Sequence, residues 1–116
     1  MDGATNHAAG MAAEGQVARH YEDAGLSIAS RRWRGQGGEI DLVCRDGDSV
    51  VFVEVKRARD LARAAHRVSR RQVERLLTAA AEFLGGEPRG GLTETRFDVA
   101  LVDGQGRIEI LENAFM

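Results

Sequence analysis

The sequence predicts an α/β fold in which a mixed central sheet is flanked by helices. Two segments repeat apolar residues at helical spacing, and five shorter segments have the alternation or the apolar runs of strands. They follow one another in the order α-β-β-β-α-β-β, which contains an αβββαβ core. At 116 residues and 43% hydrophobic content, the chain can bury one core without a disulfide or a structural metal. We expect a flexible N-terminus over residues 1–9 and a single domain over residues 10–116.

The two expected helices have distinct end signals. The first runs from Gly10 to Ala24 and ends at Gly25, a residue type that terminates helices. The second follows Ser69, a residue type that caps helix N-termini, and ends at Gly85. The apolar positions expected to pack on the sheet are Met11, Val17 and Tyr21 in the first helix, and Val73, Leu76, Leu77, Ala80, Ala81 and Leu84 in the second.

The expected strands are separated by turn-forming residues. Asp46-Gly47-Asp48 lies between two apolar runs and is a strong hairpin signal. Gly35-Gln36-Gly37-Gly38 is expected to be a flexible turn and not a phosphate-binding loop, because no helix follows it. Segment 57–66 has no clear periodicity and is interpreted as a mobile arm or the ragged start of a helix. The expected strands cover residues 26–34, 39–45, 49–56, 93–102 and 107–111.

Cysteine content and hydropathy predict a soluble, cytoplasmic protein. Cys44 is the only cysteine, so no internal disulfide can form, and it is interpreted as a small core residue in preference to a reactive thiol. No apolar run approaches the ~20 residues of a membrane span. The N-terminus also lacks the basic flank and apolar segment of a secretion signal.

Charge is distributed unevenly along the chain. The formal net charge of −2 argues against nucleic-acid binding, but residues 56–75 carry a net +6 and the remainder −8. Such a basic segment can follow a phosphate backbone despite the acidic total. Viewed alone, the run is more typical of a solvated helix face with a flexible arm. The arginines that would contact nucleic acid are Arg57, Arg59, Arg63, Arg67, Arg70, Arg71 and Arg75.

Charged residues gather at the ends of the second and third strands. Glu39 and Asp41 share one face of the second strand, because side chains alternate along a strand. Glu54 and Lys56 likewise share one face of the third. The preceding run Val50–Val53 is apolar on both faces, so we expect both faces to be covered and the charges to lie at the rim of a buried sheet. Charge is unfavourable there without compensation.

One interpretation of these charges is a metal-dependent hydrolytic site. Asp41 and Glu54 would supply oxygen ligands suited to Mg²⁺ or Mn²⁺, with the backbone carbonyl of Val55 as a further ligand. The metal would lower the pKa of a bound water and stabilise charge on a phosphate. Lys56 would orient the attacking water or neutralise the developing charge. Glu14 would complete the site if the first helix packs there; otherwise it stabilises the first turn of its own helix.

A cross-strand ion pair between Lys56 and either Asp41 or Glu54 is the structural alternative, since charged pairs on strands are common. Three acids against one lysine favour the metal site, because an ion pair would leave excess negative charge at the end of an apolar strand. Other chemistries have less support. The three histidines are scattered, and the sequence contains neither a serine or cysteine catalytic motif nor zinc-ligand spacing.

The ordered set of motifs resembles a known family. Ile40-Asp41 on the second strand and Glu54-Val55-Lys56 on the third, in the αβββαβ order, resemble the restriction-endonuclease-like PD-(D/E)xK fold. More narrowly, the chain is similar to the YraN-like family of predicted endonucleases, which resemble archaeal Holliday-junction resolvases. The similarity covers residues 10–115 and includes Ala13-Glu14, residues 38–43 and 51–57, Arg75-Leu76, residues 96–99 and Asn113-Ala114-Phe115.

The resemblance implies a Mg²⁺- or Mn²⁺-dependent endonuclease that cuts DNA. Asp41 and Glu54 would be metal ligands, Lys56 the catalytic lysine and Glu14 an accessory acid, whereas Glu39 would be an accessory neighbour that positions the site. Two residues depart from the family pattern. Ile40 replaces the proline of the motif, which the superfamily tolerates. Gln72 replaces a lysine on the second helix; it would still bind a phosphate but adds no charge.

Two functions from different classes follow from this reading. The first is DNA hydrolysis, in branched or structured DNA, where cutting two strands needs two sites and therefore suits a homodimer. The second is a non-catalytic nucleic-acid-binding or protein-interaction module that keeps the nuclease-like fold and uses the charged hairpin structurally. Fold alone does not decide between them.

Overall fold

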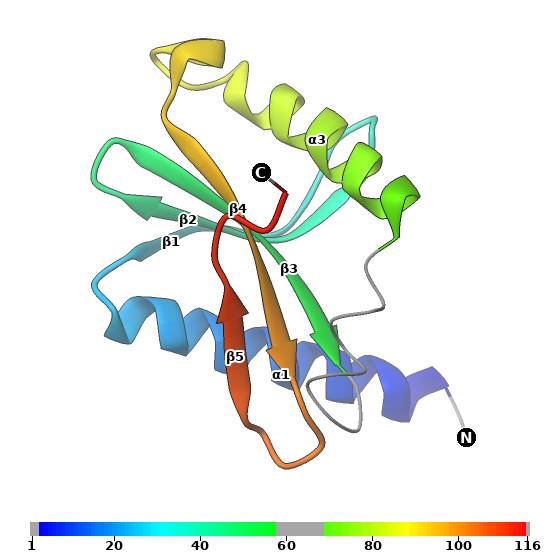
Figure 1. Ribbon diagram of the computed structural model, residues 1–116. Coiled ribbons are helices and arrows are strands. Elements are labelled where there is room, and N and C mark those ends of the chain that lie inside the picture. The colour runs from blue at the N-terminus through cyan, green and yellow to red at the C-terminus, as the bar shows by residue number, and fades with distance from the viewer. Residues whose placement is uncertain (1–2, 58–68, 116) are drawn as a thin grey trace.

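The computed structural model describes residues 3–57 and 69–115, and the side chains of the first helix from Gly10 onward. Figure 1 shows the order of the elements along this part of the chain. Their bounds are α1 Gly3–Asp23, β1 Ser27–Arg34, β2 Glu39–Asp46, β3 Ser49–Arg57, α3 Arg70–Leu84, a 3-10 helix Gly90–Leu92, β4 Thr95–Val102 and β5 Ile108–Leu111. The α/β class and the αβββαβ order predicted from the sequence are confirmed.

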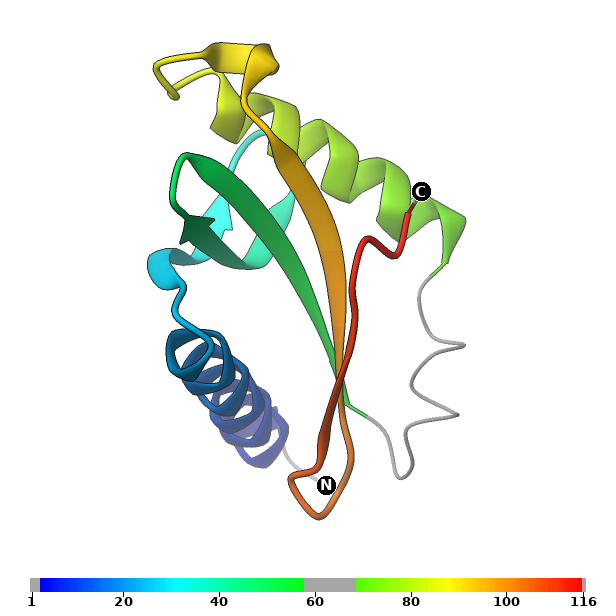
Figure 2. The same cartoon turned by 60° about the vertical axis from the view of Figure 1, so that its left-hand side comes forward.

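The strands form one mixed sheet in sequence order, β1-β2-β3-β4-β5. β3 and β4 are parallel, and the other neighbours are antiparallel. A parallel pair needs a crossover connection, and α3 lies within the segment that joins β3 to β4. As Figures 1 and 2 show, α1 and α3 cover opposite faces of the sheet, so the fold has three layers.

The face under α1 is packed mainly with small and β-branched side chains. Tyr21 is the largest buried residue that α1 contributes, and Val53 and Cys44 lie opposite it on the sheet. Burial raises the pKa of the Cys44 thiol to about 12. The thiol is therefore protonated at neutral pH, which supports its reading as a core residue.

The face under α3 is more aromatic. Phe52 on β3 stacks on Phe97 of β4 with ring centroids 5.3 Å apart, and Phe83 of α3 meets Phe52 edge-on at 5.7 Å. Ser69 caps α3 as predicted: its hydroxyl accepts from the Gln72 N–H, and the Gln72 side chain accepts from the Ser69 N–H. The helix thereby gains a fixed beginning.

Several element boundaries and exposures differ from prediction. α1 begins at Gly3 and not at Gly10, and the strand ends shift by one or two residues. The flexibility expected of residues 1–9 stays a prediction. Met11 and Leu77, expected on apolar faces, are 50% and 44% exposed, because helical periodicity alone does not set the width of the covered stripe. The arm predicted for segment 57–66 lies, beyond Arg57, outside the described residues.

No helix in the described ranges 3–57 and 69–115 is both long enough and apolar enough to span a membrane.

A buried aspartate joins α1, β4 and the C-terminal segment. Asp98, 1% exposed, accepts a hydrogen bond of 2.7 Å from the Tyr21 hydroxyl. It also accepts 3.1 Å bonds from the Arg96 guanidinium and from the backbone N–H of Asn113. A buried carboxylate is tolerated when it is paired and hydrogen-bonded in this way. The partners of Asp98 are distant in the sequence and could not be identified from it.

Replacing Tyr21 by Phe tests this contact. The change removes only the hydroxyl, so the free energy of unfolding should fall by about 1.5–3 kcal/mol, the range for a hydrogen bond to a charged group. Urea denaturation at pH 7 would measure it. Leu92→Ala is the control, because Leu92 is 80% exposed and its truncation should change stability by less than about 0.5 kcal/mol. Equal stability of Y21F and the wild type would contradict the prediction.

Candidate metal centre

The site begins where β2 and β3 separate. Their antiparallel pairing runs from Asp46↔Ser49 to Leu42↔Val53. Beyond that point β3 continues beside β4 as far as Arg57↔Val102, whereas the start of β2 is paired only with β1. The two strands therefore form a fork, and the residues just past its closed end are Asp41 and Glu54.

The alternation of β2 is broken at the same place. Ile40 packs in the cluster under α3, but Leu42, two residues on, packs under α1. Opposite this break, between the register pairs Arg31↔Leu42 and Trp33↔Ile40, Arg32 has a φ of 54°. A side-chain-bearing residue rarely adopts that left-handed conformation. The local distortion accompanies the placement of Asp41 on the α3 side, where Glu39 also lies.

Asp41 and Glu54 are brought together inside the fork. The Val55 backbone N–H, on a stretch of β3 that β2 no longer pairs, donates a 2.8 Å hydrogen bond to Asp41 Oδ2. The Glu54 side chain is 14% exposed and is hydrogen-bonded to Asp41. Burial, that hydrogen bond and the charge of Asp41 raise the pKa of Glu54 to about 9, although Lys56 and Arg75 oppose the shift. The Glu54 carboxyl therefore holds a proton at neutral pH in the absence of metal.

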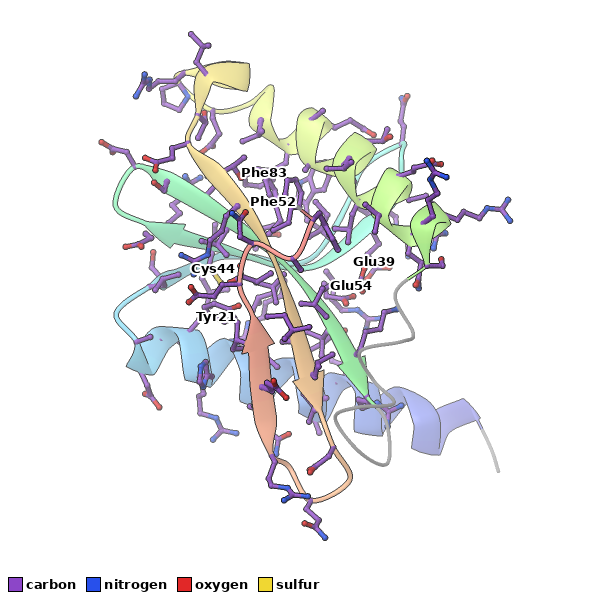
Figure 3. All side chains as sticks on the ribbon, in the orientation of Figure 1. Tyr21, Glu39, Cys44, Phe52, Glu54 and Phe83 are labelled. Atoms are coloured by element: carbon purple, nitrogen blue, oxygen red, sulfur yellow. The ribbon has the colours of Figure 1, made fainter. Side chains whose placement is uncertain are left out.

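A pocket of about 230 Å³ opens over these acids. Its strand side is formed by Glu39, Asp41 and Glu54, and its helix side by Gln72, Arg75 and Leu76 of α3. Figure 3 shows Glu39 and Glu54 pointing into the space beside the beginning of α3. The pocket thus places acidic oxygens opposite an amide and a guanidinium group.

Lys56 lies beside the acid pair, as the strand spacing predicted. Its Nζ is 4.0 Å from Glu54 Oε1, and its side chain is 17% exposed. That distance is at the limit for an ion pair. The residues of the predicted Asp41–Glu54–Lys56 group are therefore adjacent, with Lys56 the more loosely attached.

Glu14 is held by a different partner. Its Oε2 is 3.9 Å from Nε of Arg32, and the same nitrogen is 3.2 Å from Glu39 Oε1. Arg34 reaches the second oxygen of Glu39 at 3.2 Å. Glu39 therefore lines the pocket as a charge already paired with arginines, and Glu14 is joined to the site's rim through Arg32. Arg32 could not be identified from the sequence, because a left-handed conformation at an arginine leaves no signal there.

The predicted basic surface is described only in part. Arg57 is exposed at the end of β3, and Arg70 and Arg71 are exposed at the beginning of α3. Arg70 Nε lies 4.0 Å from Glu74 one turn further along. The remaining predicted contacts, Arg59, Arg63 and Arg67, lie outside the described residues.

The donor atoms fit a hard divalent cation, with a small ligand set. The described part of the chain contains no group of three or more His, Cys, Asp or Glu side chains arranged to hold a metal ion. Asp41 and Glu54 offer oxygen donors only, which suit Mg²⁺ or Mn²⁺. Glu54 is buried beside Asp41, so this is a place where a cation would relieve repulsion between the two acids. The Val55 carbonyl remains a predicted ligand.

The raised pKa of Glu54 predicts how stability depends on pH without metal. Between about pH 5 and 9 the folded protein keeps the Glu54 proton while the unfolded chain releases it, so stability falls as pH rises. The slope would be at most about 1.4 kcal/mol per pH unit, the value for one proton. Urea denaturation in EDTA across this range would show the slope in the wild type.

Glu54→Gln should lose this slope and be more stable than the wild type at pH 8. Glu109→Gln, which changes an exposed carboxylate on β5, is the control and should keep the slope. A Glu54→Gln variant less stable than the wild type at pH 8 would instead support the ion-pair interpretation.

Comparison with known proteins places the chain in a family. The uncharacterised protein family UPF0102 matches residues 13–102. A UPF0102 protein of Ruegeria pomeroyi is 63% identical over 113 residues, covering 97% of this chain and 92% of that protein. A UPF0102 protein of Cereibacter sphaeroides is 61% identical over 115 residues, covering 99% of this chain and 98% of that protein. The chain therefore belongs to the uncharacterised protein family UPF0102.

Proposed function

We propose that the protein is a metal-dependent endonuclease that hydrolyses phosphodiester bonds in DNA. The observation that carries the proposal is the convergence of Asp41 and Glu54 at the fork, facing Gln72 and Arg75 across one pocket. Hydrolysis of a phosphodiester needs a Lewis acid that activates the phosphate and groups that neutralise the charge on its oxygens. The pocket offers groups for both.

The resemblance to the YraN-like family and to the PD-(D/E)xK fold supports the same proposal. The motif residues of that resemblance, Asp41, Glu54 and Lys56, are the ones that lie together here. The family UPF0102 is described as uncharacterised, so its name adds no activity. The proposal therefore rests on the site and on the motif.

Asp41 and Glu54 would hold Mg²⁺ or Mn²⁺ once Glu54 has released its proton. Such an ion supplies Lewis-acid stabilisation of a phosphate and lowers the pKa of a bound water. The Val55 N–H fixes Asp41 by a 2.8 Å hydrogen bond and so orients one ligand before any ion arrives. Lys56, beside Glu54, would orient the attacking water or neutralise charge that develops on the phosphate.

The helix side of the pocket would receive the substrate. Arg75 and Gln72 can both donate hydrogen bonds to phosphate oxygens, and Arg70 and Arg71 extend the basic surface from the beginning of α3. Contacts of this kind position a nucleic acid without reading its sequence. We therefore expect recognition of DNA shape, including branched DNA, with little base specificity.

A binding module without catalysis is the second candidate. Its support is that Glu54 has partners without metal, namely the hydrogen bond to Asp41 and Lys56 at 4.0 Å. In that case the acids stabilise the fork, and DNA binding would persist in EDTA.

Cleavage assays separate the two candidates. Purified protein incubated with plasmid, single-stranded and four-way-junction DNA in Mg²⁺ or Mn²⁺ should produce nicks. Asp41→Ala, Glu54→Gln and Lys56→Ala should each lower the rate by about 100-fold or more, as expected for loss of a ligand or a charge-stabilising group. Gel electrophoresis of time courses gives the rates.

Glu109→Gln serves as the matched control for loss of a negative charge and should cut at the wild-type rate, since Glu109 lies on β5 and does not line the pocket. Absence of cleavage by the wild type, or unchanged cleavage by the Asp41 and Lys56 variants, would refute the catalytic proposal.

Light scattering would show whether the protein is a homodimer, as paired cuts at a junction require. A strict monomer would argue against symmetric junction cleavage.

A further inference from the structure

A carboxylate on α3 binds the glycine-rich turn that was expected to be flexible. The turn Gly35–Gly38 joins β1 to β2 and is closed by a 2.9 Å bond from Gly35 N–H to Gly38 C=O. The Gln36 N–H donates to Glu82 Oε2 at 2.8 Å, and the Gly37 N–H donates to Glu82 Oε1. Both oxygens of one side chain therefore hold two successive backbone N–H groups, an arrangement that favours an anion.

α3 contacts this turn through more than one side chain. Thr78 touches the Gly37 position, and Arg75 lies 3.7 Å from the position of a Cβ at Gly38. Positions 75, 78 and 82 form one stripe along the helix. Gln72, one turn before Arg75, continues it, and Gln72 and Arg75 line the pocket. The stripe that holds the turn is thus the one that forms the helix side of the site.

Small residues make this approach possible. A Cβ at Gly37 would lie 2.5 Å from Thr78 Cγ2 and 2.8 Å from Glu82 Oε1. A Cβ at Gly35 would lie 2.6 Å from Glu82 Oε2. Real Cβ atoms do not approach other atoms so closely. A side chain at Gly37 would push the turn away from Thr78 of α3, whereas one at Gly35 would displace the Glu82 carboxylate or the Trp33 ring.

The turn belongs to a part of the sheet that β3 does not support. We call residues 33–41 the hairpin tip; they are paired between β1 and β2, but β2 has no pairing with β3 before Leu42. The hairpin tip carries Glu39 and Asp41, whereas Glu54 lies on β3. Its position relative to β3 therefore depends on the single Val55–Asp41 hydrogen bond, on packing against α3 and on the bonds to Glu82.

We propose that Glu82 is a positioning residue that fixes the hairpin tip against α3 and thereby sets the geometry of the acid pair for metal binding. The inference rests on the proposed function, since it takes Asp41 and Glu54 as the metal ligands. Glu82 is exposed, so its bonds contribute modestly to global stability. Its effect on the site can therefore be separated from its effect on folding.

Calorimetric titration of the metal-free protein with Mn²⁺ tests the proposal. Glu82→Ala should raise the Kd for Mn²⁺ about tenfold, the low end for residues that orient metal ligands. Its melting temperature should fall by only about 4 °C or less. Glu82→Gln keeps one carbonyl oxygen as an acceptor and should recover part of the affinity.

Glu74→Ala is the matched control. Glu74 is an exposed glutamate on the same helix that pairs with Arg70 and does not line the pocket, so its loss should leave the Kd unchanged. Gly37→Ala should weaken Mn²⁺ binding with Glu82 intact. Combined with Glu82→Ala, it should add less than the sum of the two single effects, because both changes act through one contact.

Amide hydrogen exchange at Gln36 and Gly37 tests the contact independently of metal. Protection in the wild type that is lost in Glu82→Ala, together with the weaker Mn²⁺ binding, supports the proposal. Lost protection with unchanged Mn²⁺ affinity, or no protection in the wild type, overturns it. A third outcome is that Gln36 and Gly37 are protected in the wild type but Mn²⁺ binding does not depend on Asp41 and Glu54. The proposed function has then failed. The inference fails with it, although the contact between Glu82 and the turn is present.

Discussion

The separation of β2 from β3 beyond Leu42↔Val53 is the constraint on which the site depends. A strand that leaves its neighbour exposes backbone groups that must find other partners. Here the Val55 N–H finds Asp41, so a backbone group released by the fork orients an acid. The same separation makes room for Glu54 beside Asp41 and leaves the space over both to α3. One hydrogen bond thus gives a partner to a backbone N–H group of β3 and orients an acid of the site.

Much of the fold could be predicted, because its signals are local. Ser69 and Gly85 bound α3, and Asp46-Gly47-Asp48 lies in the hairpin, since capping and turn chemistry act over a few residues. The grouping of Asp41 with Glu54 also followed from the hairpin, which puts these residues on neighbouring strands, although the break in the alternation of β2 was not predicted. What could not be predicted depends on contacts between distant residues. Tyr21 meets Asp98 across 77 positions and Gln36 meets Glu82 across 46, and neither pair leaves a pattern in the sequence.

Glu14 lies on a helix that was predicted from the sequence, but its carboxylate makes a contact that was not predicted. Its helix packs on the sheet as required, yet the carboxylate lies against Arg32 and not among the lining residues of the pocket. The arginine adopts a left-handed conformation opposite Asp41, which places its guanidinium between Glu14 and Glu39. Glu14 and Glu39 are therefore paired with arginine, whereas Glu54 has Asp41 as its neighbour.

The parallel pairing of β3 with β4 has a consequence for the order in which the molecule acquires its acid chemistry. Val50 pairs with Thr95 and Glu54 with Val99, so each contact closes a loop of 45 residues. Such non-local pairing forms late in folding, after hairpins such as β2–β3. In the hairpin alone Glu54 would be hydrated and would lack burial, the largest cause of its raised pKa. The full rise in the Glu54 pKa is therefore a property of the folded domain and not of the hairpin alone.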